Sequence, residues 1–311
     1  MIQFHHVSVL LNECLEGLQI KPAGIYVDGT LGGAGHSCRI AQQLTTGRLI
    51  GIDRDRVALK AAGERLKPYN ERVTLVHSNF SDMANVLKRL GISGVDGILL
   101  DLGVSSPQLD DGARGFSYMA DAPLDMRMNG EDPLNAETVV NTWSQEELKR
   151  ILYTYGEERY APQIAAAICR RRETAPIQTT LELVDVIRSA MPAAALREKQ
   201  HPAKRSFQAI RIAVNDELGA VERVMNDAID LLNPGGRLAI ITFHSLEDRM
   251  VKTAMAEAAK GCSCPPSFPV CVCGKKPRVK LIGRKPVTAS DEELKDNPRA
   301  RSAKLRVCEK L

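Results

Sequence analysis

The sequence lacks any long apolar run. Its longest apolar stretches, such as residues 238–241, fall far below the ~18 residues that a membrane-spanning helix needs. Residues 1–6 also lack the basic and apolar regions of a secretory signal peptide. We therefore expect a cytoplasmic protein with no membrane partner, and its 311 residues suffice for about two domains.

The chain has little net charge, but that charge is unevenly distributed. Lys and Arg exceed Asp and Glu by 42 to 38 over the whole chain. Residues 275–311 contain 12 basic and 5 acidic residues, which leaves 30 basic and 33 acidic residues in 1–274. The basic end favours contact with nucleic acid or another polyanion, although a solvated basic end without a partner is nearly as common.

The C-x-x-C pairs of ordinary zinc knuckles are absent, but a cysteine cluster is present. Cys262, Cys264, Cys271 and Cys273 form two C-x-C pairs. In a reducing cytoplasm, close cysteines predict metal ligands before disulfides, and zinc is the expected metal. The alternative is a reduced, metal-free loop.

A complete dinucleotide-binding fingerprint is also missing, although a glycine-rich turn is present. Residues 25–28 form a short strand that ends in an acid, and four glycines follow within residues 29–35 before a helix over residues 37–44. Cys38 stands where the third glycine of G-x-G-x-x-G is expected. Such a turn lets the backbone approach a nucleotide. The alternative is a turn that serves only as a tight connection between strand and helix, which is about as common.

Acidic residues end two further predicted strands. The strand over residues 48–53 ends in Asp53, near the spacing at which a carboxylate receives two ribose hydroxyls. The alternative for Asp53 is an N-cap of the helix over residues 56–66. The apolar strand that begins at residue 95 ends in Asp101. Because parallel strands end at one edge of an open sheet, where ligands bind, we expect both acids at that edge.

Two side chains with aromatic rings, Phe80 and His244, lie near the ends of predicted strands. Phe80 closes the third strand, over residues 72–80, where it suits adenine stacking and core packing equally well. His244 follows the strand of residues 237–242 by two positions. His244 could act as a general base, but a structural role is the stronger prediction.

The alternation of strands and helices stops for about a hundred residues. Ser144 and Glu147 predict a capping box, and helices are expected over residues 162–168 and 180–189. One long amphipathic helix is expected to carry Ile210, Val214, Leu218, Val221 and Met225. The α/β pattern then resumes, so the chain is predicted to be an α/β protein with a helical insertion.

Together these pieces resemble a class I AdoMet-dependent methyltransferase, with a Rossmann-like, doubly wound sheet. The resemblance rests on the acid-initiated glycine turn, the acid that ends the second strand and the L-x-P-G-G-x-L entry to the fifth. More narrowly, the chain resembles the small-subunit (16S) ribosomal RNA cytosine-N4 methyltransferase family, RsmH or MraW. The matching stretches run almost end to end: residues 6–13, 26–36, 52–55, 97–110, 114–117, 123–128, 155–159, 206–211, 234–248 and 297–301.

The resemblance implies an AdoMet-binding domain over residues 1–111 and 215–311, with an inserted helical substrate-recognition domain over 112–214. It also implies that S-adenosyl-L-methionine lies across the strand ends. The residues expected to contact it are Ala34, Gly35 and His36 on the methionine side, Asp53 at the ribose, Phe80 at the adenine, and Asp101 and Gln108 in the rest of the pocket. The cysteine cluster is not present in every relative, so a metal there is no general requirement of the chemistry.

The implied activity is methylation of the exocyclic N4 of a specific cytidine in the decoding region (P site) of 16S rRNA, in the small ribosomal subunit. Residues 101–104 keep the strand-end acid of amino-methylating enzymes but lack the Pro-Pro-aromatic that follows it. Asp101, or a backbone carbonyl in residues 102–105, is expected to accept a hydrogen bond from the amino group. A role of Asp101 in cofactor binding alone stays open. The candidates for phosphate contacts are Lys204, Arg205, Arg299 and Arg301.

Other interpretations stay open at this point. The chain could methylate another RNA, or serve as a catalytically idle RNA-binding assembly factor. A nicotinamide-dependent oxidoreductase would share the fold and Asp53, but it would need the third fingerprint glycine. A homodimer also stays open, because the residues do not report the oligomeric state.

Overall fold

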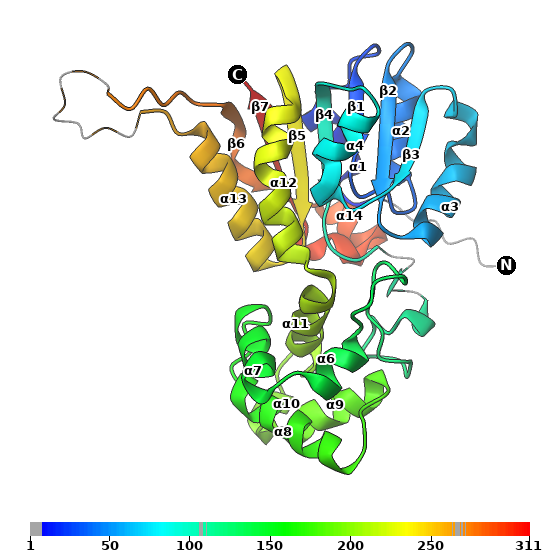
Figure 1. Cartoon of the computed structure of the whole chain (residues 1–311), viewed down its shortest axis with the longest axis vertical. Helices are drawn as coiled ribbons and strands as arrows, with labels where there is room; N and C mark the ends of the chain where they lie inside the picture. Colours follow the sequence, from blue (N-terminus) through cyan, green and yellow to red (C-terminus); the bar gives the residue numbers. More distant parts are fainter. Residues whose placement is uncertain are drawn as a thin grey trace. The chain divides into compact units, whose positions relative to one another are not determined.

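The computed structural model describes residues 8–105, 108–109, 111–262, 264, 268, 270 and 272–311. The chain divides into two compact units (Figure 1). The first comprises Met1–Gly103 and Leu218–Leu311, and the second comprises Val104–Glu217. The second unit therefore begins before residue 112 and ends after residue 214, the bounds expected for the insertion.

Seven strands of the first unit form one sheet in the order β3-β2-β1-β4-β5-β7-β6. The strands are β1 (Ile25–Asp28), β2 (Arg48–Asp53), β3 (Val73–His77), β4 (Val95–Asp101), β5 (Leu232–Thr242), β6 (Val279–Val287) and β7 (Lys304–Lys310). Strands β1 to β5 pair in parallel, and β7 runs antiparallel to both β5 and β6. The chain proceeds from β1 to β2 and β3 on one side and resumes with β4 on the other side of β1. The switch point, where open α/β sheets bind ligands, therefore lies between β1 and β4. The predicted doubly wound α/β class is confirmed.

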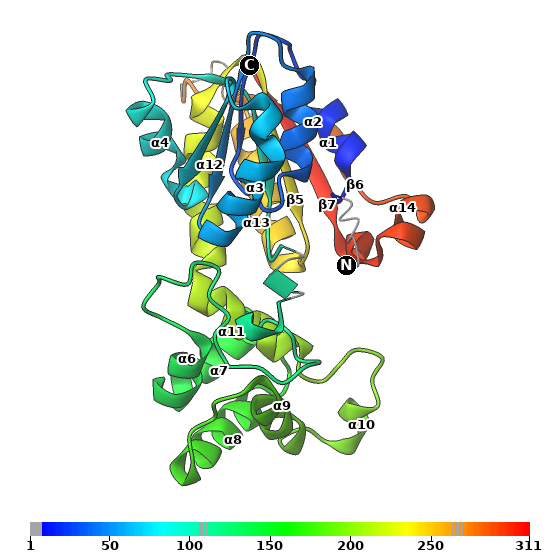
Figure 2. The ribbon, with the colours of Figure 1, turned by 90° about the vertical axis from the view of Figure 1, so that its right-hand side faces the viewer.

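Helices cover both faces of this sheet (Figures 1 and 2). Buried residues of α4, α12 and α13 pack on one face, and those of α1, α2 and α3 pack on the other. The helices of the first unit are α1 (Leu11–Leu18), α2 (Gly35–Gln43), α3 (Arg56–Leu66), α4 (Met83–Arg89), α12 (Glu217–Leu231), α13 (Ser245–Ala259) and α14 (Asp291–Asp296). Because both faces are buried, the central strands are continuously apolar rather than alternating.

The second unit is helical and has its own core. Its helices are α6 (Ala136–Thr142), α7 (Gln145–Thr154), α8 (Ala161–Thr174), α9 (Thr180–Ser189), α10 (Ala193–Leu196) and α11 (Lys204–Asn215). Their apolar faces enclose fully buried Leu148, Ile164 and Leu183. The predicted capping box of Ser144 and Glu147 is present at the start of α7.

The prediction of one long helix through Ile210 and Met225 is wrong. The helix ends at Asn215, and α12 begins at Glu217, because Asp216 takes a left-handed conformation with φ 49°. The Asn215 side chain accepts a hydrogen bond from Met128 N and donates one to Met126 O, both at 2.7 Å. These bonds join Asn215 to a segment that is distant in sequence, at the point where the helix ends. The apolar periodicity of the sequence does not reveal this break between the two helices.

The strand β6 is not among the strands that the sequence predicts. It has one buried residue at its start, Val279, and is otherwise mostly exposed. It contains three basic residues and Pro286, as is usual for a sheet-edge strand protected against further pairing. Its polar sequence therefore lacks the apolar run that marks the other strands.

Among the helices that the structure describes, none combines the length and the apolar character of a membrane span.

Candidate active site at the ends of the parallel strands

Three neighbouring parallel strands end in aspartate. These residues are Asp28 of β1, Asp53 of β2 and Asp101 of β4. Asp28 pairs with Gly51 of β2 on one side and with Leu99 of β4 on the other, so each flanking strand extends two residues further before its acid. The structure thus brings the predicted Asp53 and Asp101 to one edge, and adds Asp28 between them.

A hydrogen-bond network holds the glycine turn against β4. Ser37 Oγ donates to Asp28 Oδ2 at 2.7 Å, and Thr30 N donates to Asp28 Oδ1 at 3.2 Å. Thr30 Oγ1 accepts a hydrogen bond from Asp101 N at 2.6 Å. Thr30 therefore connects the first acid with the third, a role that sequence reasoning missed because no local pattern links residues 71 positions apart.

Burial raises the pKa of all three aspartates, and the shift is largest for Asp28 and Asp101. It raises the pKa of Asp28 to about 6, against the opposing effect of the hydrogen bonds from Ser37 and Thr30. It raises the pKa of Asp101 to about 8, with further contributions from the negative charges of Asp28 and Glu247. A quarter of the Asp101 side chain (26%) is exposed, yet its Oδ1 is shielded from solvent and has no hydrogen-bond partner among the described residues. Such a group favours a cation or a hydrogen-bond donor as its neighbour.

Asp53 is fixed in place by backbone amides. Its Oδ2 accepts from Gly32 N and its Oδ1 accepts from Asp55 N, both at 2.8 Å. The N-cap of α3 is Asp55, so the alternative of an N-cap role for Asp53 is wrong. Each carboxylate oxygen has a second lone pair, which leaves Asp53 able to accept two hydroxyl groups.

The three residues predicted beside the methionine moiety differ in what they can offer. The Ala34 side chain is fully buried in the core, so only its backbone can face a ligand. A Cβ on Gly35 would stand 1.8 Å from Ser8 Oγ, so packing within the chain already requires glycine there. His36 is buried, with Nε2 3.0 Å from Val9 O and Nδ1 3.9 Å from Asp101 Oδ2.

Gly33 differs from Gly35 in its surroundings. A Cβ on Gly33 would meet no atom of the described chain within 4 Å. Gly33 is also not among the glycines with positive φ. The described residues therefore give no packing reason for glycine at this position, and they leave room above the turn for a ligand to approach the backbone.

Phe80 and Gln108 lie in different units. Phe80 is half-buried, packs against the core, and its Cβ lies 3.1 Å from where a Cβ on Gly29 would stand. Phe80 is thus next to the glycine turn, as adenine stacking and core packing both require. Gln108 belongs to the second unit, where it is buried and its Oε1 accepts from Ser105 N at 3.0 Å.

The remaining predicted residues are dispersed. Lys204 and Arg205 begin α11 in the second unit, whereas Arg299 and Arg301 are exposed in the 3-10 turn Pro298–Ser302 of the first. Cys262, Cys264 and Cys273 lie together between α13 and β6. The fourth predicted metal ligand, Cys271, lies outside the described residues.

His244 caps a helix. Its Nδ1 accepts from Glu247 N at 3.4 Å, and the Glu247 carboxylate accepts from His244 N, which forms a capping box at the start of α13. The structural role predicted for His244 is confirmed. Glu247 itself is fully buried and contributes to the raised pKa of Asp101, an influence that the sequence did not suggest.

The strand order, the glycine turn and the acidic strand ends are the arrangement of a class I AdoMet-dependent methyltransferase. The chain belongs to the MraW methylase family, whose family model matches residues 3–311. It is 60% identical over 311 residues to the "Ribosomal RNA small subunit methyltransferase H" of Brevibacillus brevis, covering 100% of this chain and 99% of that protein. Proteins of the same name from Heliobacterium modesticaldum and Symbiobacterium thermophilum are both 57% identical, covering 99% of this chain and 99% and 97% of those proteins.

Proposed function

We propose that this protein transfers a methyl group from AdoMet to the exocyclic N4 of a specific cytidine in the decoding region (P site) of 16S rRNA. The observation that carries the proposal is the cluster of Asp28, Asp53 and Asp101 around the glycine turn, in a chain of the MraW methylase family. Family membership speaks against a nicotinamide-dependent oxidoreductase. The retained acidic cluster speaks against a catalytically idle assembly factor.

The residues at this edge fit AdoMet chemically. AdoMet supplies a methyl group on a positively charged sulfur and also carries an ammonium group, so an acidic surrounding stabilises it. Asp53 would accept the ribose hydroxyls, Phe80 would flank the adenine, and the backbone of residues 33–36 would contact the methionine end. The contribution of Gln108 stays a prediction.

Asp101 has the properties of the group that accepts the amino hydrogen. The lone pair of the cytosine amine is delocalised into the ring, so an acceptor at its N–H returns electron density to nitrogen. Asp101 has a shielded, unpartnered Oδ1 and a raised pKa, and both properties favour taking up a proton or a hydrogen-bond donor. Thr30 holds the Asp101 backbone through its hydroxyl, and thereby fixes where the carboxylate stands.

Methyl transfer from labelled AdoMet to small ribosomal subunits tests the proposal. The subunits come from a strain without this activity, and nucleoside analysis identifies the product. We expect N4-methylated cytidine at a single position. Another methylated nucleoside, or transfer only to a different RNA, would contradict the assignment. AdoMet binding without any transfer would favour an RNA-binding assembly factor.

Basic residues of both units are expected to bind the RNA phosphates. Replacing Lys204 and Arg205 by alanine should weaken RNA binding and reduce the slope of log K against log salt by roughly 0.7–0.9 for each phosphate that is no longer neutralised. Replacing Arg299 and Arg301 tests the first unit in the same way. AdoMet affinity should not change, because none of the four belongs to the acidic edge.

Binding titrations over a range of salt concentrations measure this effect. Lys60→Ala with Lys67→Ala provides a matched control, since both lysines are exposed in or directly after α3. An unchanged salt slope in either test pair would remove that pair from the RNA interface.

We further propose a cytoplasmic location, where the small ribosomal subunit would be the partner. Zinc, the second predicted cofactor, stays a prediction for the cysteine cluster. The homodimer stays an untested prediction.

A further inference from the structure

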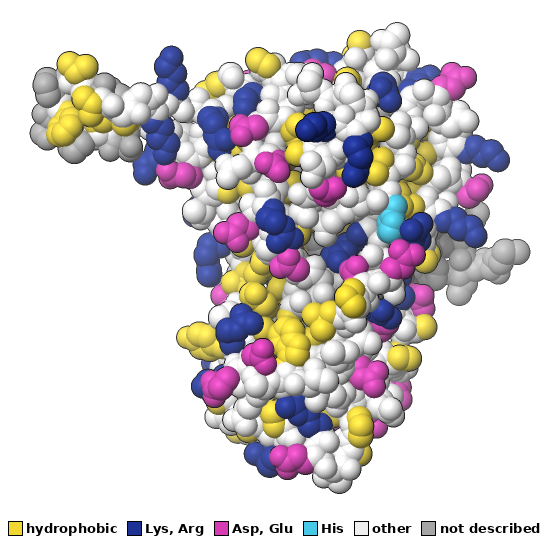
Figure 3. Space-filling model, viewed as in Figure 1, with side chains coloured by type: hydrophobic (Ala, Val, Ile, Leu, Met, Phe, Trp, Pro, Cys, Tyr) yellow, Lys and Arg dark blue, Asp and Glu magenta, His cyan; other side chains and the backbone are white. Residues whose placement is uncertain are grey.

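The segment between α13 and β6 is described at residues 261–262, 264, 268, 270 and 272–278, and this described part extends away from the sheet of the first unit (Figure 1). We call it the arm. Figure 3 shows hydrophobic side chains toward its end and Lys and Arg side chains where it joins the unit. Phe268, Val270 and Val272 are 49%, 70% and 73% exposed. The described side chains of the arm therefore supply little apolar burial.

Three thiols of the arm face one another. One ligand atom each from Cys262, Cys264 and Cys273 lie within 4.8 Å of one another, and the Sγ atoms of Cys262 and Cys273 are 3.7 Å apart. Sulfurs bound about 2.3 Å from one zinc ion at tetrahedral angles lie about 3.8 Å apart. A disulfide would need about 2.05 Å. The separation thus fits a shared metal ion rather than a sulfur–sulfur bond.

The backbone around the thiols supports the same geometry. Cys264 N lies 3.4 Å from Cys262 Sγ and donates a hydrogen bond to it. A backbone N–H directed at sulfur stabilises the thiolate form, which is the form that binds metal. Directly after Cys273, Gly274 takes a left-handed conformation with φ 61°, and the chain turns there.

We propose that Cys262, Cys264 and Cys273 bind one zinc ion through their thiolates. Three sulfur ligands favour zinc over the hard cations Mg²⁺ and Ca²⁺, which prefer oxygen. Each thiol releases its proton to solvent as its sulfur binds the metal, and no oxidant or reductant is needed. Lys275 and Lys276 lie two and three residues after Cys273, so positive charge is close in sequence to the negative charge that three thiolates leave on the complex.

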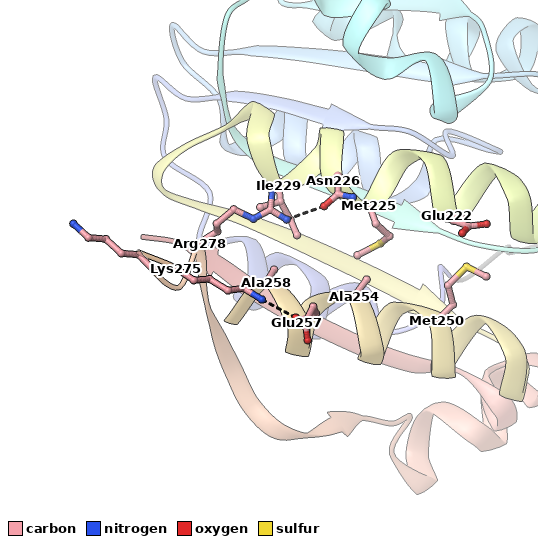
Figure 4. A pocket seen from close by; sticks show the side chains of 11 residues that line it. Glu222, Met225, Asn226, Ile229, Met250, Ala254, Glu257, Ala258, Lys275 and Arg278 are labelled. Atoms are coloured by element: carbon pink, nitrogen blue, oxygen red, sulfur yellow. Dashed lines mark hydrogen bonds and ion pairs between the residues drawn. The ribbon is translucent and has the colours of Figure 1, made fainter. Parts of the chain in front are cut away.

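The zinc ion fixes the arm at its junction with the unit. Lys275 Nζ forms an ion pair with Glu257 of α13 at 2.7 Å. Arg278 pairs with Asp230 of α12 at 3.0 Å and donates to Asn226 at 2.7 Å. Lys275, Glu257, Arg278 and Asn226 line a pocket of about 480 Å³ between α12 and α13 (Figure 4). Metal binding at Cys273 therefore restricts the chain two residues before the first of these interactions.

Metal analysis of the full-length protein, purified under reducing conditions without chelators, tests the proposal. We expect about one zinc ion per chain. The protein stripped of metal should take up one Co²⁺ and acquire the absorption bands of a tetrahedral thiolate site. Cys262→Ser, Cys264→Ser and Cys273→Ser should each weaken metal binding by more than about 100-fold, the upper end of the effect of removing an outer-shell partner. Cys169→Ser in α8 is the matched control and should bind metal like the unchanged protein.

Limited trypsin digestion gives a readout that is independent of methyl transfer. Zinc should protect the bond after Lys275, and chelation or Cys273→Ser should expose it; the bond after Lys276 is not a trypsin site, because Pro277 follows. Substoichiometric zinc that reconstitution does not raise, cobalt spectra without thiolate bands, or an iron–sulfur chromophore would each overturn the proposal. So would equal metal loss in Cys169→Ser. None of these outcomes depends on whether the protein methylates cytidine.

Discussion

Asp101→Asn is expected to lower the rate of methyl transfer by about 100-fold or more, and to weaken AdoMet binding by much less than that. Asparagine has the size of aspartate and keeps one acceptor oxygen, but it cannot take up a proton. General bases typically contribute about 10²–10⁴-fold to a rate. Single-turnover kinetics and AdoMet titration on the same variant separate the two effects.

The rate of methyl transfer is expected to depend on pH in a definite direction. Only the ionised Asp101 can accept the proton, and burial raises its pKa to about 8 in the free chain. The value of kcat/KM for AdoMet, which reports the free enzyme, should therefore rise with pH up to about 8 and then level off. Asp101→Asn should abolish this rise.

A second substitution on the same strand serves as the control. Asp96→Asn also changes an aspartate of β4, but Asp96 lies near the start of the strand and pairs with Lys21 at 3.2 Å. It should retain both turnover and the pH profile. Full turnover in Asp101→Asn with AdoMet binding intact would show that the carboxylate is not the acceptor, and would direct attention to the backbone carbonyls of residues 102–105.

The Asp101 carboxyl group is also expected to lower the free energy of unfolding. A raised pKa means that the folded chain binds the proton more tightly than the unfolded chain, so this group makes folding less favourable as pH rises from about 4 to about 8. Asp101→Asn should then unfold at a higher temperature than the unchanged protein at pH 8. A substitution that raises stability but lowers turnover is typical of a residue whose function requires an energetically unfavourable environment.

Local patterns predict the elements that local forces determine. The apolar strand β2 and the helices α3 and α9 have the bounds that composition and caps indicate. Asp53 and Asp101 could be placed because parallel topology alone brings strand ends to one edge. For these two residues, the predicted strand order alone therefore indicates the edge of the sheet at which they lie.

Contacts between distant segments account for most of what the sequence did not reveal. Thr30 binds Asp101 N, Ser8 fills the space beside Gly35, and Glu247 adds its charge to the site from α13. The break at Asp216 coincides with bonds from Asn215 to the backbone of residues 126 and 128. No periodicity records such pairings, because they depend on the folded arrangement of separate elements.

Gly33→Val is expected to weaken AdoMet binding by about 10- to 100-fold without destabilising the protein. A Cβ on Gly33 would meet no atom of the described chain within 4 Å, so the described residues leave the space beside this position open. If AdoMet lies against this turn, valine would occupy its space, and such overlap typically costs about 1–3 kcal/mol. Calorimetric titration with AdoMet and thermal unfolding measure the two quantities.

Two further glycine variants show whether the effect comes from the ligand. Gly130→Val makes the same change at another open position, in the second unit, and should alter neither AdoMet affinity nor stability. Gly35→Ala should destabilise the chain even without AdoMet, since its Cβ would overlap Ser8 Oγ. Unchanged AdoMet affinity in Gly33→Val would mean that the space above the turn is not the cofactor site. A loss of affinity at full stability would mean that glycine at position 33 serves the cofactor, whereas glycine at position 35 serves the packing of the chain.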